Sequence, residues 1–317
     1  MDFFVKKTNE LTEQELQQLL DLFNKVFECD RSMDVMLRQY TQNVMGWSYH
    51  SFFVDEGKIQ GAITYIPANY WYGGERKVFV NSVDTMIARE YRDLYELLEL
   101  LGNGYKAMKD DGVALVYGYP NDNSFPVYIK SKTMRSVGKM RTYCLPYRIG
   151  GVKPGLAFLD LFTKVFAWCY AYTLGLLASP AVAGFLIHKD DDSYNATRYK
   201  RLDGDYGIAR IKDFTLYYKV KEHEGVRTAF IIDIDRKSPR NFCLAVKYLL
   251  KRERKNFDLI LYPGSLPFWN TDMICLPRRF EPKNFNFAVQ ILDRSLKKED
   301  VLNIGNWDTN LSNYDLL

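Results

Sequence analysis

The fold of this chain is decided by the stretch Val83-Asp84-Thr85-Met86-Ile87-Ala88-Arg89-Glu90-Tyr91-Arg92. It overlaps the end of Lys77 to Ile87, which is predicted to be a strand, and the start of Tyr91 to Lys109, where apolar residues recur at helical spacing. The short apolar run Ala114 to Tyr119 then predicts another strand. A strand, a helix and a strand in this order predict a right-handed βαβ crossover with parallel strands.

The segments before this crossover predict two helices. Glu13 to Phe27 carries apolar residues at helical spacing, and Thr12 with Glu15 has the spacing of a capping box. A second amphipathic segment runs from about Ser32 to Gln42.

Three strands are then predicted to pair antiparallel. Ser51 to Val54 and Ile59 to Ile66 flank a tight turn at Asp55 to Lys58. Gly73-Gly74 marks a second hairpin turn, which leads into Lys77 to Ile87.

The second half repeats this theme as strand, strand, helix, strand, strand, in the segments Gly207–Val220, Arg227–Asp235, Asn241–Arg254, Phe257–Tyr262 and Phe285–Leu292. The repetition predicts a duplicated α/β fold, in which helices flank mixed, twisted sheets. We expect an N-terminal domain over residues 1–150, an apolar helical connector over 151–192 and a C-terminal domain over 193–317.

The connector contains an uncharged run from Val165 to Ile187, which is long enough for a membrane span. Ser179-Pro180 in its middle and two glycines oppose a span. The open alternatives are buried helices or a homodimer contact, peripheral contact with a membrane, and a true span.

Composition limits the function. A formal net charge of +4 over 317 residues does not indicate a nucleic-acid binder. Five cysteines without Cys-x-x-Cys spacing indicate reduced thiols and a cytoplasmic location, and the three histidines lack metal-ligand spacing, so no metal is expected. The N-terminus shows no secretory signal pattern.

Three motifs together resemble the GNAT superfamily of acetyltransferases, and within it a two-lobed bacterial subgroup. Ile87 followed by Tyr91-Arg92 resembles the end of that family's fourth strand. Asn121 followed seven positions later by Tyr128 resembles the segment after its fifth strand. The ending Gly305-Asn306-Trp307-Asp308 is similar to the close of the subgroup.

The resemblance implies direct transfer of an acetyl group from acetyl-coenzyme A to an amine. Tyr128 would protonate the departing thiolate, and Asp84 would take a proton from the amine. Backbone N–H groups near Met86 and Ile87 would polarise the thioester carbonyl, while the helix start near Tyr91 would bind the pyrophosphate. The implied cofactor contacts are Met86, Ile87, Arg92, Asp93, Leu94, Tyr95 and Asn121.

The chain departs from the family at the phosphate-binding turn. Tyr95 and Leu97 stand where small residues are expected, and Asp93 and Glu96 add negative charge. A carboxylate about 4 Å from a phosphate costs roughly 1–4 kcal/mol. The corresponding turn of the second half, Arg236 to Asn241, has no glycine but three cations, which either hold an anion or are simply solvated.

Two functional hypotheses follow. One is an N-acyltransferase for a small amine, with amino sugars among the candidates. The other is a GNAT-fold binding or assembly protein that has lost coenzyme A. For Tyr128 a packing role is the alternative to catalysis, and for Asp84 the alternative is a structural role at the strand end.

Overall fold

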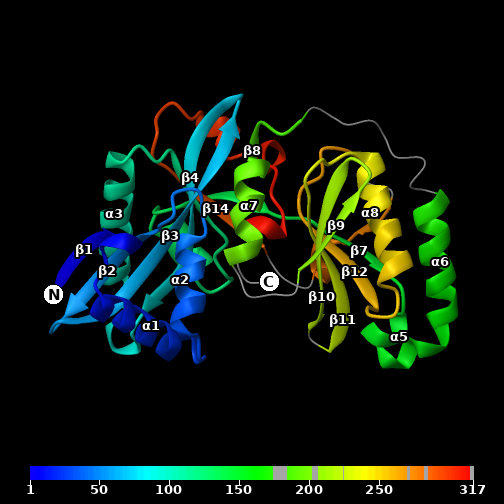
Figure 1. The fold of residues 1–317 in the computed structure, drawn as a ribbon, viewed down its shortest axis with the longest axis horizontal. Helices are drawn as coiled ribbons and strands as arrows, with labels where there is room; N and C mark the ends of the chain where they lie inside the picture. Colours follow the sequence, from blue (N-terminus) through cyan, green and yellow to red (C-terminus); the bar gives the residue numbers. More distant parts are fainter. Residues whose placement is uncertain (174–183, 202–205, 224, 270–271, 282–284, 315–317) are drawn as a thin grey trace. The chain divides into compact units, whose positions relative to one another are not determined.

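The structure is a computed structural model that describes all residues except 174–183, 202–205, 224, 270–271, 282–284 and 315–317. The chain divides into two compact units, each drawn from three stretches of sequence. The first unit consists of Met1–Lys139, Leu186–Asp203 and Phe285–Asn306, and the second of Met140–Phe185, Gly204–Asn284 and Trp307–Leu317. Each unit contains a twisted sheet with helices against it (Figure 1).

A mixed sheet forms the centre of the first unit. Within the described residues it has eight strands in the order β1-β2-β3-β4-β5-β14-β6, with β8 paired to β3 outside this path. Its strands are β1 Asp2–Lys7, β2 Tyr49–Asp55, β3 Lys58–Tyr72, β4 Glu75–Ile87, β5 Leu115–Gly118, β6 Arg135–Lys139, β8 Ile187–Lys189 and β14 Asn286–Ile291. Only β4 and β5 pair in parallel among these described strands. The predicted α/β class with a mixed sheet is confirmed.

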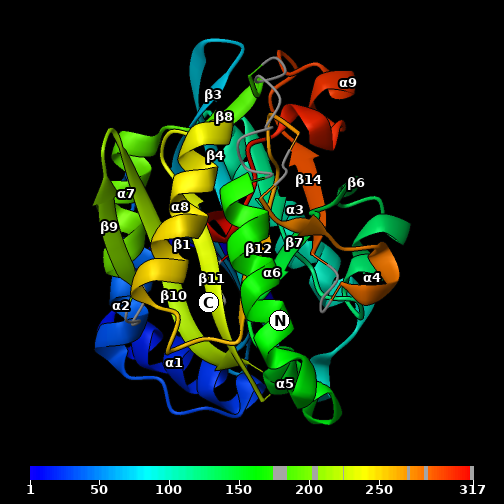
Figure 2. The ribbon, with the colours of Figure 1, turned by 90° about the vertical axis from the view of Figure 1, so that its right-hand side faces the viewer.

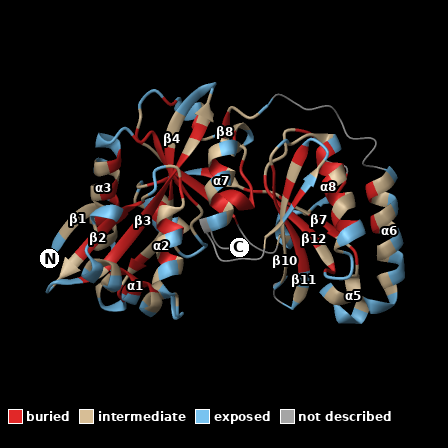
Figure 3. Cartoon of the chain, in the orientation of Figure 1, coloured by how far each residue is buried: buried red, intermediate tan, exposed pale blue. Residues whose placement is uncertain are grey.

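Helices cover both faces of this sheet. They are α1 Glu13–Phe27, α2 Met33–Thr41, α3 Leu94–Asp110, α4 Phe125–Lys130, α7 Asp191–Arg201 and α9 Lys298–Val301, with 3₁₀ turns η1 Thr8–Glu10, η2 Arg89–Tyr91 and η6 Ile304–Asn306. Neighbouring strand residues point to opposite faces, so Phe52 joins the core under α1 and α2 while Phe53 joins the core under α3. Buried residues accordingly concentrate along the strands (Figure 3).

The predicted capping box of α1 is confirmed. The Thr12 hydroxyl accepts a hydrogen bond from the backbone N–H of Glu15 at 3.2 Å, and the Glu15 carboxylate accepts one from the backbone N–H of Thr12 at 2.9 Å. These bonds satisfy amides that have no partner within the helix. Leu19 and Phe23 on α1 are buried against the sheet, and each such side chain contributes about 1.5–3 kcal/mol.

Two features of the first sheet differ from the sequence prediction. β1 pairs antiparallel with β2 at the sheet edge, where we expected no strand. The assignment of Phe285–Leu292 to the second half is wrong, because β14 pairs with β5 through Ala288 opposite Gly118. Alternating apolar residues predict a strand, but they do not say which sheet edge the strand will join.

The sheet of the second unit has six strands within the described residues, in the order β13-β7-β12-β11-β10-β9. They are β7 Thr142–Pro146, β9 Gly207–Ile211, β10 Phe214–His223, β11 Val226–Ile234, β12 Leu259–Pro263 and β13 Ile274–Cys275. Its helices are α5 Ile149–Val152, α6 Asp160–Thr173 and α8 Pro239–Arg252, with 3₁₀ turns η3 Pro154–Leu159, η5 Arg278–Phe280 and η7 Leu311–Asn313. β11 pairs antiparallel with β10 and parallel with β12, as β4 does with β3 and β5.

The uncharged run Val165 to Ile187 is only partly described. Its first part lies in α6, where Ala167 and Ala171 are fully buried in the core of the second unit. Ser179-Pro180 and Gly175 fall outside the described residues. A search of the described part of the chain finds no helix that is long and apolar enough to cross a bilayer.

Candidate active site

β4 and β5 separate near their carboxyl ends. They pair only from Phe79 opposite Leu115 to Asn81 opposite Tyr117, although β4 continues to Ile87. β5 ends at Gly118, and Pro120, which has no N–H to donate, follows two residues later. We call the resulting opening the β4–β5 fork. A binding site at the carboxyl end of parallel strands is a common arrangement in α/β proteins.

A β-bulge changes the direction of β4 at the point where the fork opens. Ala62 of β3 pairs with Met86 and Thr64 pairs with Val83, so Asp84 and Thr85 together face a single residue of β3. Asp84 has φ of 49°, in the left-handed region that non-glycine residues seldom adopt. A bulge takes main-chain groups out of the strand ladder and turns side chains toward a new direction, and bulges are over-represented next to active sites.

A cavity of about 670 Å³ lies at the fork. Its walls come from the end of α1, the bulged end of β4, the turn before α3, the start of α3 and α4; the lining residues are Val26, Thr85, Ile87, Arg92, Asp93, Leu94, Leu97, Ser124, Val127, Tyr128, Lys130 and Ser131. The structure therefore brings five of the predicted site residues to one cavity: Ile87, Arg92, Asp93, Leu94 and Tyr128.

Four other predicted site residues do not line this cavity: Asp84, Met86, Tyr95 and Asn121. Met86 is fully buried in the core under α1 and α2. Tyr95 is 59% exposed and meets Phe3 edge-on, so it does not fill the fork. The Asn121 side chain accepts hydrogen bonds from the backbone N–H groups of Asn123 and Ser124, which fixes the turn before α4.

Sequence reasoning missed Thr85 and the polar wall of α4. Thr85 stands inside the decisive stretch, beside the predicted Asp84, but only the bulge shows that it faces the cavity. Lys130 is on α4 and Ser131 directly follows it, both within three residues of Tyr128. This closeness to a predicted site residue is the sequence feature that could have identified them. No local signal connects Val26 of α1 with this site.

Tyr128 bridges the two sides of the fork. Its hydroxyl lies 3.1 Å from the hydroxyl of Thr85, which places a residue of α4 against the bulge of β4. Burial raises the pKa of Tyr128, and the Thr85 hydrogen bond opposes this only in part. The phenol is therefore protonated at neutral pH, and it can donate a proton but is not a base.

Asp84 is held by two hydrogen-bond donors and a nearby cation. Its carboxylate accepts hydrogen bonds from the Tyr40 hydroxyl at 2.8 Å and from the Gln39 amide at 3.2 Å. The Arg31 guanidinium lies 3.8 Å from the same oxygen. Burial, together with the Asp84 charge, raises the pKa of Tyr40 well above its usual value, so Tyr40 stays a donor. This cluster ties α2 and the loop before it to the bulge.

A carboxylate of the protein, that of Asp93, caps the start of α3. Asp93 is the N-cap residue, and its carboxylate accepts the backbone N–H of Leu94. The neighbouring Arg92 donates from Nε to the carbonyl of Ile87 at 3.0 Å. Because helix N-termini attract anions through free amides and the helix dipole, a capping carboxylate partly neutralises this attraction.

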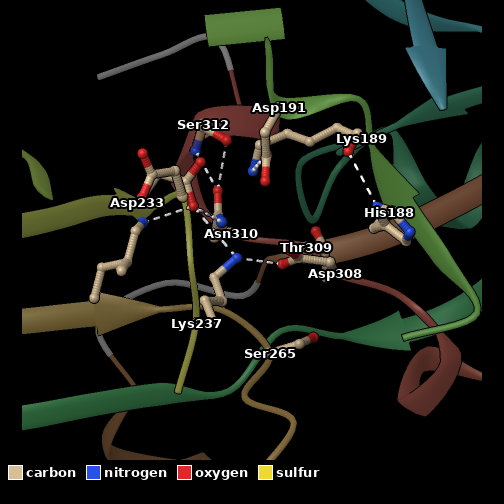
Figure 4. A network of polar contacts seen from close by, with 12 residues as sticks. His188, Lys189, Asp191, Asp233, Lys237, Ser265, Asp308, Thr309, Asn310 and Ser312 are labelled. Carbon is tan, nitrogen blue, oxygen red and sulfur yellow. Dashed lines mark hydrogen bonds and ion pairs between the residues drawn. The ribbon is translucent and has the colours of Figure 1, made fainter. Parts of the chain in front are cut away.

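In the second unit, the corresponding opening between β11 and β12 contains the segment around Asn310. Asn310 forms a backbone bridge with Gly264, just after β12, and its amide donates to Asp233 of β11 at 2.6 Å (Figure 4). Lys237 binds Asp308 and lies 3.3 Å from Asp233. One cation of the basic turn Arg236–Asn241 thus pairs with carboxylates of the protein itself.

Potential metal ligands do not cluster in either unit: a search of the described residues for three or more neighbouring His, Cys, Asp or Glu side chains finds no such group.

Comparison with known proteins places these features in context. No protein-family model matches the chain, and no curated protein matches it. Several solved structures, in contrast, are similar to it. A GCN5-related N-acetyltransferase from Anabaena variabilis has a TM-score of 0.58 at 12% identity, covering 91% of this chain and 73% of that chain. The chain has the GNAT fold.

Two further solved structures are similar to the chain at the same level. A protein from Enterococcus faecalis, described as a probable N-acyltransferase, has a TM-score of 0.56 at 11% identity, covering 92% of this chain and 73% of its own. Eis1 from Mycobacterium abscessus has a TM-score of 0.56 at 12% identity, covering 92% of this chain and 74% of its own. At this coverage the similarity includes residues of both units.

Proposed function

We propose that this chain is an N-acyltransferase that moves an acetyl group from acetyl-coenzyme A to a small amine at the β4–β5 fork. The observation that carries the proposal is the fork itself, an opening at the ends of two parallel strands with a protonated phenol on its wall. The GNAT fold and the names of the similar structures support the reaction class. Fold alone is weaker evidence of chemistry than the site.

The cavity matches the pantetheine arm of acetyl-coenzyme A better than it matches the diphosphate. Ile87, Leu97 and Val127 give it apolar walls that match an acylated pantetheine arm. The diphosphate matches the start of α3 less well, because Asp93 caps the helix there. Arg92 and Lys130 line the same cavity and supply the positive charge that the capped helix start lacks.

Different groups of the protein have different roles in the proposed acyl transfer. Acetyl-coenzyme A supplies the acetyl group as a thioester. Main-chain N–H groups released from the ladder by the bulge are the candidates to stabilise charge on the carbonyl oxygen. Tyr128 holds the proton that the leaving sulfur needs, and Thr85 orients that hydroxyl.

Asp84 has a different role in this proposal from the one that the resemblance implies. Two hydrogen-bond donors and the Arg31 guanidinium already surround its carboxylate. This arrangement favours Asp84 as a positioning residue that holds the bulge against α2. The proton of the amine then leaves to solvent through the open side of the cavity.

A second candidate function is binding without catalysis, in a GNAT-fold protein that no longer takes coenzyme A. The capping carboxylate of Asp93 is the observation that favours it. The open fork favours the enzyme, because Tyr95 does not block it.

Calorimetric titration with acetyl-coenzyme A and coenzyme A tests the proposal. We expect one binding site per chain, since Asn310 occupies the corresponding opening of the second unit. Binding should also raise the melting temperature. Incubation with a panel of amines, read by mass spectrometry, should then show acetylated product. Absence of both heat and thermal stabilisation at ligand concentrations on the order of millimolar would remove the enzyme proposal.

A further inference from the structure

Helix α6 of the second unit is apolar on both its faces. Ala167 and Ala171 are fully buried against the core, and Phe166 and Tyr170 pack at its margin. A helix that is apolar all round is normally enclosed on every side. In this unit the face of α6 that points away from the sheet is exposed instead.

The exposed face is a continuous apolar stripe that begins in η3. Successive members are three, one and three residues apart, which places them along one side of a helix. The stripe consists of Phe158, Leu161, Phe162 and Val165, which are 78%, 75%, 67% and 55% exposed. Single exposed apolar residues are ordinary, but four neighbours on one helical face form a patch.

Basic residues outnumber acidic ones over α6, the segment before it and the neighbouring α8 taken together. Figure 2 shows α6 and α8 next to each other on one face of the second unit's sheet, and α6 contacts α8. In the segments Ile149–Thr173 and Pro239–Arg252 the sequence has six Lys or Arg residues and a single acid, Asp160. The ammonium groups of Lys247 and Lys251 on α8 lie 4.5 Å and 5.8 Å from the ring of Tyr172 on α6.

The single acid of these segments is already engaged. The Asp160 carboxylate accepts the backbone N–H of Gly150 at 2.7 Å, at the end of the stripe that faces α5. The face formed by α6 and α8 therefore combines exposed aromatic and aliphatic side chains with an excess of basic residues.

We propose that this face binds the surface of a bilayer that contains anionic lipids. Phe158, Leu161 and Phe162 enter the boundary between headgroups and acyl chains, and the lysines contact anionic headgroups. Such binding needs no spanning helix. A second copy of the chain is the poorer occupant, because pairing two such faces would bring the cations of one against those of the other.

Vesicle flotation tests the proposal with the intact chain. The wild-type protein should float with vesicles of phosphatidylcholine mixed with phosphatidylglycerol, float weakly with phosphatidylcholine alone, and lose binding as salt is raised. The double variant Phe158→Ser with Phe162→Ser should bind the mixed vesicles about tenfold or more weakly. These side chains are mostly exposed, so the melting temperature should not change.

A matched control uses Phe280→Ser, which removes a phenylalanine of similar exposure (59%) outside the stripe and should leave binding unchanged. Charge reversal by Lys153→Glu with Lys164→Glu should weaken binding to the mixed vesicles but not the residual binding to phosphatidylcholine. Equal flotation of wild type and the double variant would overturn the proposal. So would a dimer in light scattering that the double variant abolishes while neither protein floats.

Discussion

The hydroxyls of Tyr128 and Thr85 lie 3.1 Å apart, which joins α4 to the bulged end of β4. Tyr128 lies on α4, which follows β5 in the chain, and Thr85 lies on β4, so the contact joins β4 to the helix that follows β5. It fixes a phenol that burial keeps protonated at the wall of the cavity. The following predictions depend on this geometry and on the groups around it.

Replacing Tyr128 with phenylalanine should lower turnover about 100-fold with little change in donor affinity, because it removes one proton donor and keeps the ring. Steady-state kinetics and calorimetry measure the two effects separately. Tyr105→Phe is the control, since Tyr105 is a partly buried tyrosine in the same core but does not line the cavity. An equal loss of turnover and affinity would show that Tyr128 is structural.

Replacing Asp93 with asparagine should tighten binding of acetyl-coenzyme A by about three- to tenfold at low salt, because it removes a negative charge near the phosphates but keeps a side chain that can cap α3. The gain should shrink as salt is added. Asp110→Asn at the opposite end of α3 removes the same charge and should change little. Unchanged affinity in the Asp93 variant would mean that the diphosphate binds away from α3.

Replacing Asp84 with asparagine should lower the free energy of unfolding by about 1–3 kcal/mol, since it leaves Arg31 without its ion pair and weakens two hydrogen bonds. Turnover should fall while the shape of the pH–rate profile stays the same. Tyr40→Phe should produce a smaller change in the same direction. A variant of normal stability that loses the acidic limb of the profile would instead identify Asp84 as the proton acceptor.

The stability of the first unit should fall in mild acid because of His50. Burial lowers the pKa of His50 to about 3, and the ring lies within hydrogen-bond distance of the hydroxyls of Thr8 and Thr64. The unfolded chain binds a proton near pH 6.5 and the folded chain does not, so stability is present above 6.5 and is lost as pH falls. The loss between pH 7 and pH 5 should be about 2 kcal/mol. Urea unfolding of wild type and His50→Gln should show a smaller pH slope in the variant.

Replacing Asn310 with alanine should destabilise the second unit by about 1–3 kcal/mol, because the buried Asp233 loses a donor. Donor affinity should not change, since the proposed site lies in the first unit. A new binding site in titrations of this variant would show that the C-terminal segment had blocked it.

Much of the local structure could be predicted from the sequence. The helical spacing of Glu13 to Phe27 with its capping box gave α1 with its observed ends, and Gly73-Gly74 gave the hairpin between β3 and β4. The place of Arg92 and Tyr128 at one cavity was expected only from the resemblance to the GNAT family. The helix, the hairpin and the crossover from β4 through α3 to β5 were predictable directly. These features depend on residues close in sequence, where periodicity, caps and turn chemistry act directly.

Other features depended on contacts between distant segments. The pairing of β14 with β5, the position of Asn310 between β11 and β12, and the approach of Val26 to the cavity join residues that are far apart in the chain. No local pattern encodes such partners, because the same alternating or polar segment can satisfy several sheet edges. The sequence by itself determined the principal helices and strands around the site and their order. Only the tertiary structure decided that one fork stays open while the other is filled, because burial and hydrogen bonding of the whole chain select among pairings that are locally equivalent.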